Sequence, residues 1–245
     1  MKTVLITGCS SGFGLETARY FLERDWKVIA TMRRPDNSLL PRSDHLRVLG
    51  LDVTDAESIR AAVEAAGPID ALVNNAGIGM LGVFETTPMA ITRDLFETNT
   101  FGTFALIQAV LPQMRARKAG VVVNVTSSVT LKPLPLLSVY TASKAAVTAF
   151  TESLALELQP LNIRVAVVEP GRSPTRFAEN ARPRMQGDVP DAYTDFVGNV
   201  FAGMGPSAGT EPLDVAQAVW RAVKDPASPM RMPAGADAIE MAQGS

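Results

Sequence analysis

Residues 3–14 read Thr3-Val-Leu-Ile-Thr7-Gly8-Cys-Ser-Ser-Gly12-Phe-Gly14. The apolar and β-branched run predicts a short buried strand, and the glycines predict a tight turn that opens a helix near Leu15. Such a turn lets a pyrophosphate approach the backbone, while the helix N-terminus offers it free N–H groups and a positive dipole end. Strand, turn and helix in this order favour a site for a nucleotide phosphate.

The rest of the chain repeats this alternation. Expected strands fall at 27–32, 47–51, 71–74, 121–126, 164–168 and 230–234, and expected helices at 12–23, 56–66, 89–118, 138–158 and 211–223. Strands that are apolar throughout and alternate with helices predict a parallel, doubly wound sheet with helices on both faces. We therefore expect one Rossmann-type α/β domain over residues 1–245, in which Pro112 kinks or divides the long helix.

Residues 172–212 differ in composition, being rich in Gly, Pro, Asn, Arg and Met with weak periodicity. Insertions of this length are usually lids or binding elements, although a plain surface loop is the alternative. We expect a mobile substrate lid with two short helices, whose apolar residues are Phe177, Met185, Tyr193, Phe196, Val197, Val200, Phe201 and Met204. Few residues follow Ala234, so we expect only a minimal substrate cap beyond the last strand.

Composition excludes several classes of protein. The 245 residues carry a net charge of −2 without a basic block, so no nucleic-acid partner is expected. Cys9 is the only cysteine and His45 the only histidine, which leaves no basis for a disulfide, a His-dependent triad or a metal site. We interpret Cys9 as a small filler, with a redox-sensitive thiol as the alternative, and His45 as a surface residue. The N-terminus has neither a signal peptide nor a membrane span, so we expect a cytoplasmic protein.

The end of the second strand bears on the choice of nucleotide. Met32 is followed by Arg33 and Arg34, and no acidic residue lies between Lys27 and Pro35. An acid at this point holds the ribose 2′-hydroxyl of NAD, whereas arginine pairs with the 2′-phosphate of NADP. The pattern predicts NADP(H), with Ser11 as a further hydroxyl contact; two solvated arginines are the alternative.

Tyr140-Thr-Ala-Ser-Lys144 places a tyrosine and a lysine one turn apart on the same helix face. When a hydride reduces a ketone, the carbonyl oxygen becomes negative and needs a proton. Free tyrosine, with a pKa of about 10, exchanges that proton inefficiently at neutral pH. A nearby ammonium favours the phenolate and lowers this pKa. Tyr140 is therefore the predicted acid in reduction and base in oxidation, with Lys144 tuning its pKa.

Several motifs together resemble the short-chain dehydrogenase/reductase family from residue 3 to about residue 175. They are the Gly-x-x-x-Gly-x-Gly turn, Asn74-Asn-Ala-Gly77, Ser127 thirteen residues before Tyr140, and Pro170-Gly-x-x-x-Thr175. Phe13 departs from the isoleucine usual in the family but keeps its bulk. Gly-Cys-Ser-Ser-Gly-Phe-Gly and Ala-Thr-Met-Arg resemble 17β-hydroxysteroid and retinol dehydrogenases, which implies a bulky apolar ketone or secondary alcohol as substrate.

The resemblance implies roles for further residues. Ser127, rather than Ser128, would donate a hydrogen bond to the developing alkoxide, and Lys144 would also bind the nicotinamide ribose. Asn99 would hold a water in a proton relay to Lys144; a helix-capping role is the alternative. Asp52 would lie beside the adenine, or would instead assist the start of the helix at 56–66. The implied cofactor contacts are Gly8, Ser10, Ser11, Gly12, Phe13, Gly14, Arg33, Arg34, Asp52, Val53, Asn75, Ala76, Gly77, Tyr140, Lys144, Pro170, Gly171, Ser173 and Thr175.

We therefore predict an NADP(H)-dependent alcohol dehydrogenase or ketone reductase acting on a small molecule. One alternative is a carrier-linked 3-oxoacyl reductase that meets an acidic carrier through Arg172, Arg176, Arg182 and Arg184. Another is a non-catalytic NADP-sensing protein. The segments 100–118 and 142–159 are apolar on more than one face. Family members pair these helices across a two-fold axis, which implies a homodimer or homotetramer.

Overall fold

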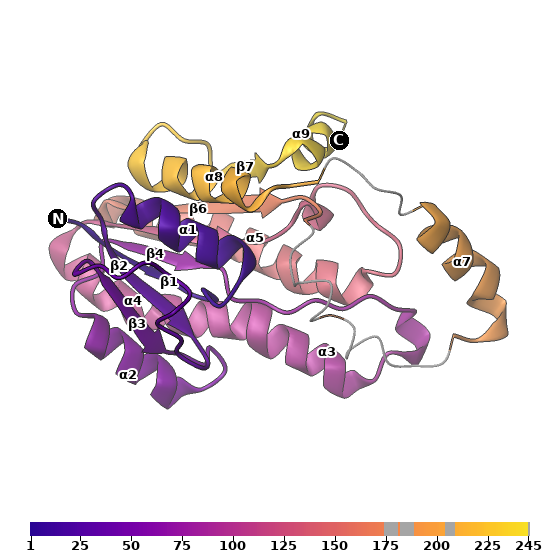
Figure 1. Ribbon diagram of the computed structural model, residues 1–245. Helices are drawn as coiled ribbons and strands as arrows, with labels where there is room; N and C mark the ends of the chain where they lie inside the picture. Colours follow the sequence, from indigo (N-terminus) through magenta and orange to yellow (C-terminus); the bar gives the residue numbers. More distant parts are fainter. Residues whose placement is uncertain (174–180, 182–188, 204–208, 245) are drawn as a thin grey trace.

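The computed structural model describes residues 1–173, 181, 189–203 and 209–244. Within these residues, seven strands form one parallel sheet in the order β3-β2-β1-β4-β5-β6-β7 (Figure 1). The chain runs outward from β1 to β3 and then crosses to β4, which is the doubly wound Rossmann order and confirms the predicted fold. The strands are β1 (Thr3–Ile6), β2 (Lys27–Met32), β3 (Leu46–Gly50), β4 (Ala71–Asn74), β5 (Gly120–Val125), β6 (Ile163–Pro170) and β7 (Arg231–Ala234).

Helices cover both faces of the sheet (Figure 1). Alternate residues of a strand point to opposite faces, and both faces here are apolar. Along β1, Val4 and Ile6 join the core beneath α1 (Gly12–Leu22) and α8 (Pro212–Lys224). Leu5 joins the opposite core, beneath α2 (Ala56–Ala66), α4 (Gly102–Arg117) and α5 (Ser138–Leu158).

An aromatic cluster fixes α1 in its place. The rings of Phe21 and Trp220 meet edge to face with centroids 5.0 Å apart, and Phe21 meets Trp26 in the same way at 5.2 Å. Edge-to-face pairs of this kind add stability beyond the area that they bury. The cluster therefore holds α1, whose N-terminus follows the glycine turn, firmly against α8 and the sheet.

The long helix expected over residues 89–118 is interrupted, but not at Pro112. α3 (Met89–Phe96) passes into a π-helical turn, η2 (Glu97–Phe101), which leads directly into α4. Pro112 lies inside α4 without ending it, so the prediction that it could divide the helix was wrong. The π turn occurs where the side chain of Asn99 is tied to neighbouring elements, and such turns often mark functional sites.

The C-terminal third holds the short helical elements η6, α7 and α9 in addition to α8. η6 (Asp191–Tyr193) and α7 (Thr194–Gly203) form the described helical part of the insert, while Phe177, Met185 and Met204 lie outside the described residues. α9 (Ala236–Gln243) follows β7 and lines the cleft described below; the expectation of only a minimal substrate cap there stays a prediction. The remaining short turns are η1 (Phe84–Thr86), η3 (Ser128–Thr130) and η4 (Gln159–Leu161). In the described part of the chain, no helix has the length and apolar character needed to cross a bilayer.

Candidate active site

A cleft of about 1840 Å³ opens along the carboxyl ends of the strands. In open parallel sheets of this kind, ligands bind at that edge because the loops after the strands converge there. The walls include residues that follow six successive strands in the chain, namely Gly8, Arg33, Asp52, Asn75, Ser127 and Gly171.

Most of the predicted site residues line this cleft. Gly14 and Asn99 lie behind its wall, and Arg34 is exposed at a position that does not line it. Thr175 lies outside the described residues. The predicted residues that do line the cleft are Gly8, Ser10, Ser11, Gly12, Phe13, Arg33, Asp52, Val53, Asn75, Ala76, Gly77, Ser127, Tyr140, Lys144, Pro170, Gly171 and Ser173.

The turn after β1 is tied to the end of β4. The hydroxyl oxygen of Thr7 accepts hydrogen bonds from the backbone N–H groups of Asn75 (2.9 Å) and Ala76 (2.8 Å). The side-chain amide of Asn75 in turn donates to the carbonyl oxygen of Thr7 at 2.8 Å. A Cβ atom at Gly14 would overlap the carbonyl oxygen of Gly8 and lie 2.5 Å from Nδ2 of Asn75. The backbone is therefore packed too closely here for any side chain at position 14.

The N-terminus of α1 fits the pyrophosphate of a dinucleotide. Gly8 and Gly12 adopt φ angles of +73° and +58°, which bring the chain sharply round into the helix. The N-cap residue, Ser11, makes no side-chain capping bond, and the first turn of the described α1 carries no acidic side chain. The first N–H groups and the positive end of the helix dipole are therefore available to an anion.

Arg33 and Asp52 lie near each other in the nucleotide half of the cleft. The pKa of Asp52 is lowered first by the backbone N–H and hydroxyl of Thr54, which donate to its carboxylate at 3.0 and 2.8 Å, and further by the charge of Arg33. Asp52 does not cap α2; Asp55 does so by accepting from two backbone N–H groups of that helix. Asp52 shapes the turn before α2, since its carboxylate accepts from Thr54 and its carbonyl oxygen accepts from the N–H of Asp55, so its place beside the adenine stays a prediction.

Cys9 lies inside the glycine turn but is fully buried, and its Sγ lies 3.3 Å from the carbonyl oxygen of Ile6. Burial raises the pKa of its thiol to about 12. A buried thiol of high pKa is unreactive, because the thiolate is the nucleophile. This environment supports the interpretation of Cys9 as a small filler.

Tyr140 lies on the first turn of α5 and is buried. Burial raises the pKa of its phenol to about 12, while a hydrogen bond with the side chain of Ser127 opposes that rise. Ser127 directly precedes η3 as its N-cap, and its Oγ accepts weakly from the N–H of Val129 at 3.4 Å. The neutral phenol is thus the stable form at pH 7, where it can donate a proton. The contact with Tyr140 supports Ser127 over Ser128.

Lys144 reaches from α5 to the end of β5. Its Nζ donates to the carbonyl oxygen of Val125 at 3.1 Å, and burial lowers the pKa of the amine to about 8. A Cβ atom at Gly77 would lie 3.2 Å from this Nζ and equally close to Oδ1 of Asn99. Gly77 and Lys144 therefore line the floor of the cleft, and Asn99 meets them from behind.

The side chain of Asn99 is held on three sides. Its Oδ1 accepts from the N–H of Ile78 at 2.8 Å, and its Nδ2 donates to the carbonyl oxygen of Ile78 (2.9 Å) and to Oγ of Ser143 (3.0 Å). Asn99 lies inside η2 and therefore caps no helix. Both amide hydrogens are used, so Asn99 fastens the segment after β4 to α5. Its predicted role in holding a water stays a prediction.

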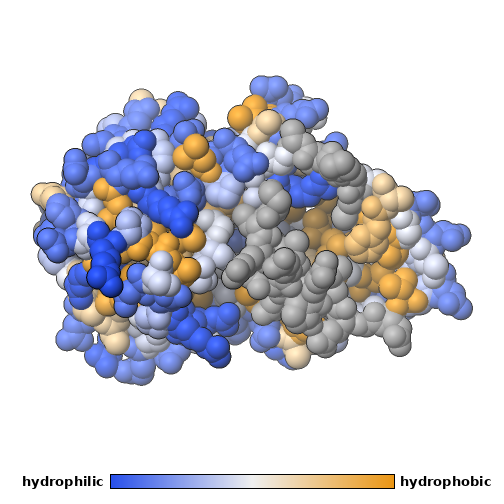
Figure 2. Space-filling model, viewed as in Figure 1, coloured by the Kyte–Doolittle hydropathy of each residue, from blue (hydrophilic) through white to orange (hydrophobic). Residues whose placement is uncertain are grey.

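Apolar side chains surround Tyr140. Val129 and Val139 pack with its ring in a third core cluster, against which Ile78, Leu134 and Leu137 also pack. Four of these residues line the cleft, as does Val200 of α7. Figure 2 shows apolar surface on the part of the molecule that α7 forms. The part of the cleft around Tyr140 is therefore lined by apolar side chains with a small number of hydrogen-bonding groups among them, as in many binding sites for small molecules.

A pair of residues that the sequence analysis missed joins α9 to the insert. Oδ2 of Asp237 accepts from the N–H of Arg172 at 2.7 Å, and Oδ1 accepts from the hydroxyl of Thr210 at 2.8 Å. Oγ1 of Thr210 also accepts from the N–H of Gly171 at 2.9 Å. Asp237 lines the cleft, yet no local pattern marks it because its partners lie 27 and 65 residues away.

These features define a class of protein. A parallel sheet whose carboxyl edge carries a glycine turn, an open helix N-terminus and a cleft is a Rossmann-type dinucleotide-binding fold. A buried tyrosine that is hydrogen-bonded to a serine, one helical turn before a buried lysine, provides acid–base groups inside that cleft.

Comparisons with known proteins identify the family. Residues 2–186 match the family model of the short chain dehydrogenases. Retinol dehydrogenase 8 of Homo sapiens is 35% identical over 94% of this chain and 80% of its own length. A short-chain dehydrogenase from Streptomyces avermitilis matches with a TM-score of 0.86 and 34% identity, over 100% of this chain and 92% of that one. Another from Burkholderia cenocepacia, solved in complex with NADP, matches with a TM-score of 0.80 and 27% identity, over 100% and 94%. The chain belongs to the short-chain dehydrogenase family and is an oxidoreductase.

Proposed function

We propose that this oxidoreductase transfers a hydride between NADP(H) and a ketone or secondary alcohol, with a bulky apolar molecule as its substrate. The observation that carries the proposal is the buried Tyr140, hydrogen-bonded to Ser127 and one turn from Lys144, in a cleft that also holds the glycine turn. Acid–base groups and a dinucleotide cradle in one cleft suit this reaction.

The nicotinamide, when bound, supplies or accepts the hydride. Tyr140 gives its phenolic proton to the substrate oxygen in reduction and takes it back in oxidation. Ser127 donates a hydrogen bond to the same oxygen as it becomes negative. The charge of Lys144, strengthened by its buried surroundings, stabilises the phenolate that Tyr140 leaves behind. The apolar residues around Tyr140 exclude water from these groups.

Arg33 supports NADP rather than NAD. It lines the cleft after β2, where the adenosine ribose of a dinucleotide lies in Rossmann folds. Ser11 lines the same cleft and adds a hydroxyl donor. A guanidinium pairs with the 2′-phosphate through two parallel hydrogen bonds, which the 2′-hydroxyl of NAD cannot provide. The NADP complex of the Burkholderia cenocepacia relative is in line with this proposal.

The apolar wall around Tyr140 supports a bulky apolar substrate, as does the likeness to retinol dehydrogenase 8. Within the insert, α7 contributes Asn199, Val200 and Gly203 to the cleft, and we propose that residues 172–212 cover the substrate there. Burial of an extended apolar molecule against these side chains would favour its binding. A homodimer or homotetramer formed through α4 and α5 completes the proposal.

A direct test is the consumption of NADPH, followed by absorbance, with a series of ketones from acetone to steroid and retinoid carbonyls and with a 3-oxoacyl carrier-protein substrate. We expect turnover with the large apolar ketones and faster turnover with NADPH than with NADH. A preference for the carrier-linked substrate would favour the alternative reductase; Arg176, Arg182 and Arg184, on which that alternative depends, lie outside the described residues. Binding of NADPH without turnover of any ketone would favour a sensing protein.

A further inference from the structure

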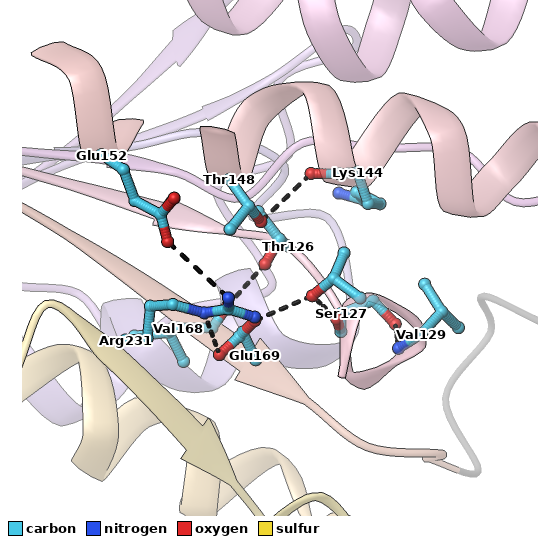
Figure 3. Close-up of polar contacts among 10 residues, drawn as sticks. Thr126, Ser127, Val129, Lys144, Thr148, Glu152, Val168, Glu169 and Arg231 are labelled. Atoms are coloured by element: carbon cyan, nitrogen blue, oxygen red, sulfur yellow. Dashed lines mark hydrogen bonds and ion pairs between the residues drawn. The ribbon is translucent and has the colours of Figure 1, made fainter. Parts of the chain in front are cut away.

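Glu169 is a buried carboxylate that the proposed reaction does not use. It is the penultimate residue of β6 and fully buried, directly before the cleft-lining Pro170. Its Oε1 accepts from Nη2 of Arg231 at 2.5 Å, and its Oε2 accepts from Nε of Arg231 at 3.3 Å (Figure 3). Removing a carboxylate from water costs much free energy unless the carboxylate is paired, and the bidentate contact with Arg231 offsets that cost for Glu169. The contact with Arg231 does not explain why a carboxylate occupies this position.

Oε1 of Glu169, the oxygen that accepts from Nη2 of Arg231, also faces the turn that carries Ser127. The hydroxyl of Thr130 lies 2.8 Å from Oε1 of Glu169 and 2.9 Å from the carbonyl oxygen of Ser127. A hydroxyl has one hydrogen, and a carboxylate is a stronger acceptor than a peptide carbonyl, so the hydrogen goes to Glu169. The N–H of Thr130 donates to the Ser127 carbonyl at 3.1 Å and closes the turn. Thr130 is thereby fastened to Ser127 through its backbone and to Glu169 through its side chain.

Arg231 also reaches the helix that carries the other reacting groups. Its Nη1 lies 3.6 Å from Oε1 of Glu152, a residue of α5 two turns beyond Lys144 (Figure 3). One arginine on β7 therefore contacts an acid on β6 and an acid on α5. Through these contacts, the turn with Ser127 and the helix with Tyr140 share a common support outside the cleft.

We propose that Glu169, held by Arg231, is a positioning residue that fixes the orientation of Ser127 through the hydroxyl of Thr130. The proposal rests on the proposed function, because that function gives Ser127 its task. Ser127 must keep its hydroxyl within reach of both Tyr140 and the substrate oxygen, and misplacement of a reacting group by 1 Å can cost about 100-fold in rate.

The test compares Thr130→Val, which keeps the shape and removes the hydroxyl, with Thr130→Ser, which keeps the hydroxyl. We expect Thr130→Val to lower kcat with the best ketone about 10- to 100-fold. The dissociation constant for NADPH should stay within about twofold, because Thr130 does not touch the glycine turn, and Thr130→Ser should restore most of the activity. Glu169→Gln, which keeps an acceptor but loses the charge, should give a smaller loss of kcat in a folded protein.

A second measurement does not depend on activity. The amides of Thr130 and Leu131 donate to the carbonyl oxygens of Ser127 and Ser128. Hydrogen exchange of these amides, measured without cofactor, should be at least about tenfold faster in Thr130→Val than in Thr130→Ser if the hydroxyl holds the turn. Unchanged exchange, or a kcat of Thr130→Val within twofold of wild type, overturns the positioning role. Absence of turnover by the wild type contradicts the proposed function instead, and exchange then decides the positioning role alone.

Discussion

The amine of Lys144 donates to the backbone carbonyl oxygen of Val125 across 3.1 Å, so α5 is fastened to β5 two residues before Ser127. This contact brings a cation into the buried floor of the cleft, where it has no carboxylate partner among the hydrogen bonds and ion pairs of the described residues. A buried, unpaired cation of this kind destabilises the folded protein, and we propose that it is kept because the proposed reaction uses its charge.

Lys144→Met should therefore make the cofactor-free protein more stable while it abolishes turnover. Burial lowers the pKa of Lys144 from 10.5 to about 8, which corresponds to about 3 kcal/mol against folding with the ammonium. Loss of the hydrogen bond to Val125 destabilises the variant by about 1 kcal/mol. We therefore expect its free energy of unfolding, measured in urea at pH 7, to exceed that of the wild type by about 2 kcal/mol. Lys132→Met, at an exposed position of the same cleft, is the control and should change stability little.

The pH dependence of that gain gives a second check. Below pH 8 the lysine is charged in both folded and unfolded protein, so the full cost of burying the charge applies. Between pH 8 and 10.5 the unfolded state binds more protons than the folded state, so the wild type gains stability as the pH rises. The difference between the two proteins should therefore shrink over this range. A difference that stays constant would contradict the buried ammonium.

Tyr140→Phe should reduce the rate of ketone reduction about 10²- to 10⁴-fold while leaving NADPH binding nearly unchanged. The phenol is buried with a pKa of about 12, so it is protonated at pH 7 and supplies the proton directly. Steady-state rates and fluorescence titration with NADPH measure the two effects. Tyr20→Phe, on α1 away from the cleft, is the matched control; activity of Tyr140→Phe within tenfold of wild type would refute the mechanism.

Arg33→Ala should weaken the binding of NADPH about 10- to 100-fold, since a charged hydrogen bond is worth about 1.5–3 kcal/mol. The affinity for NADH should change little. Arg34→Ala, one residue further along and away from the cleft, should leave both affinities within about threefold. Equal effects of the two substitutions on NADPH binding would show that Arg33 makes no specific contact with the 2′-phosphate.

Gly14→Ala should destabilise the protein by about 1–3 kcal/mol and impair NADPH binding, because the new methyl group would overlap the Gly8 carbonyl. Gly198→Ala in α7 is the control: a Cβ there meets nothing within 4 Å among the described residues, and alanine favours a helix by about 0.5–1 kcal/mol. Thermal unfolding and NADPH titration check both. Equal melting temperatures for wild type and Gly14→Ala would rule out the close packing of the turn.

Leu156→Asp combined with Phe101→Asp should dissociate the proposed oligomer. These side chains are 75% and 52% exposed, whereas Phe104 and Phe150 stack on each other within the chain. Charges on an apolar interface leave carboxylates buried and unpaired, which opposes association. Sedimentation should show a shift from dimer or tetramer to monomer. Leu213→Asp, on α8 with 44% exposure, should leave the assembly intact, and a monomeric wild type would contradict the prediction.

The sheet and the glycine turn could be predicted because their signals are local. Each strand is a short apolar run, and the bounds of β2, β4, α2 and α5 agree with the expected ranges. The turn follows β1 directly, so the residues that cradle a phosphate are adjacent in the sequence. Tyr140 and Lys144 are likewise neighbours on one helix, and their helix could be recognised from its period alone.

The remainder depends on contacts between distant residues. The π turn at 97–101 coincides with bonds from Asn99 to Ile78 and Ser143, which lie 21 and 44 residues away. Asp237 and Glu169 are ordinary acids in the sequence; only the folded chain brings them to Arg172 and Thr130. The sequence also does not show in which direction a side chain points. It therefore could not indicate that Arg33 lines the cleft and that the adjacent Arg34 does not.

The bond from the N–H of Thr210 to the carbonyl oxygen of Arg172, 2.7 Å long, closes the chain between these residues into a ring of backbone. Both ends of that ring are fixed to α9 through Asp237. The position of these two ends against the sheet therefore does not depend on the sequence of the segment between them. Doubling the length of a closed flexible loop costs only about 0.6 kcal/mol. The interval from 176 to 209, which leaves out the predicted cofactor contacts Ser173 and Thr175, is thus an exchangeable segment: sequences from relatives with other substrates could be grafted there to redirect the enzyme, with the groups proposed for hydride transfer kept in place.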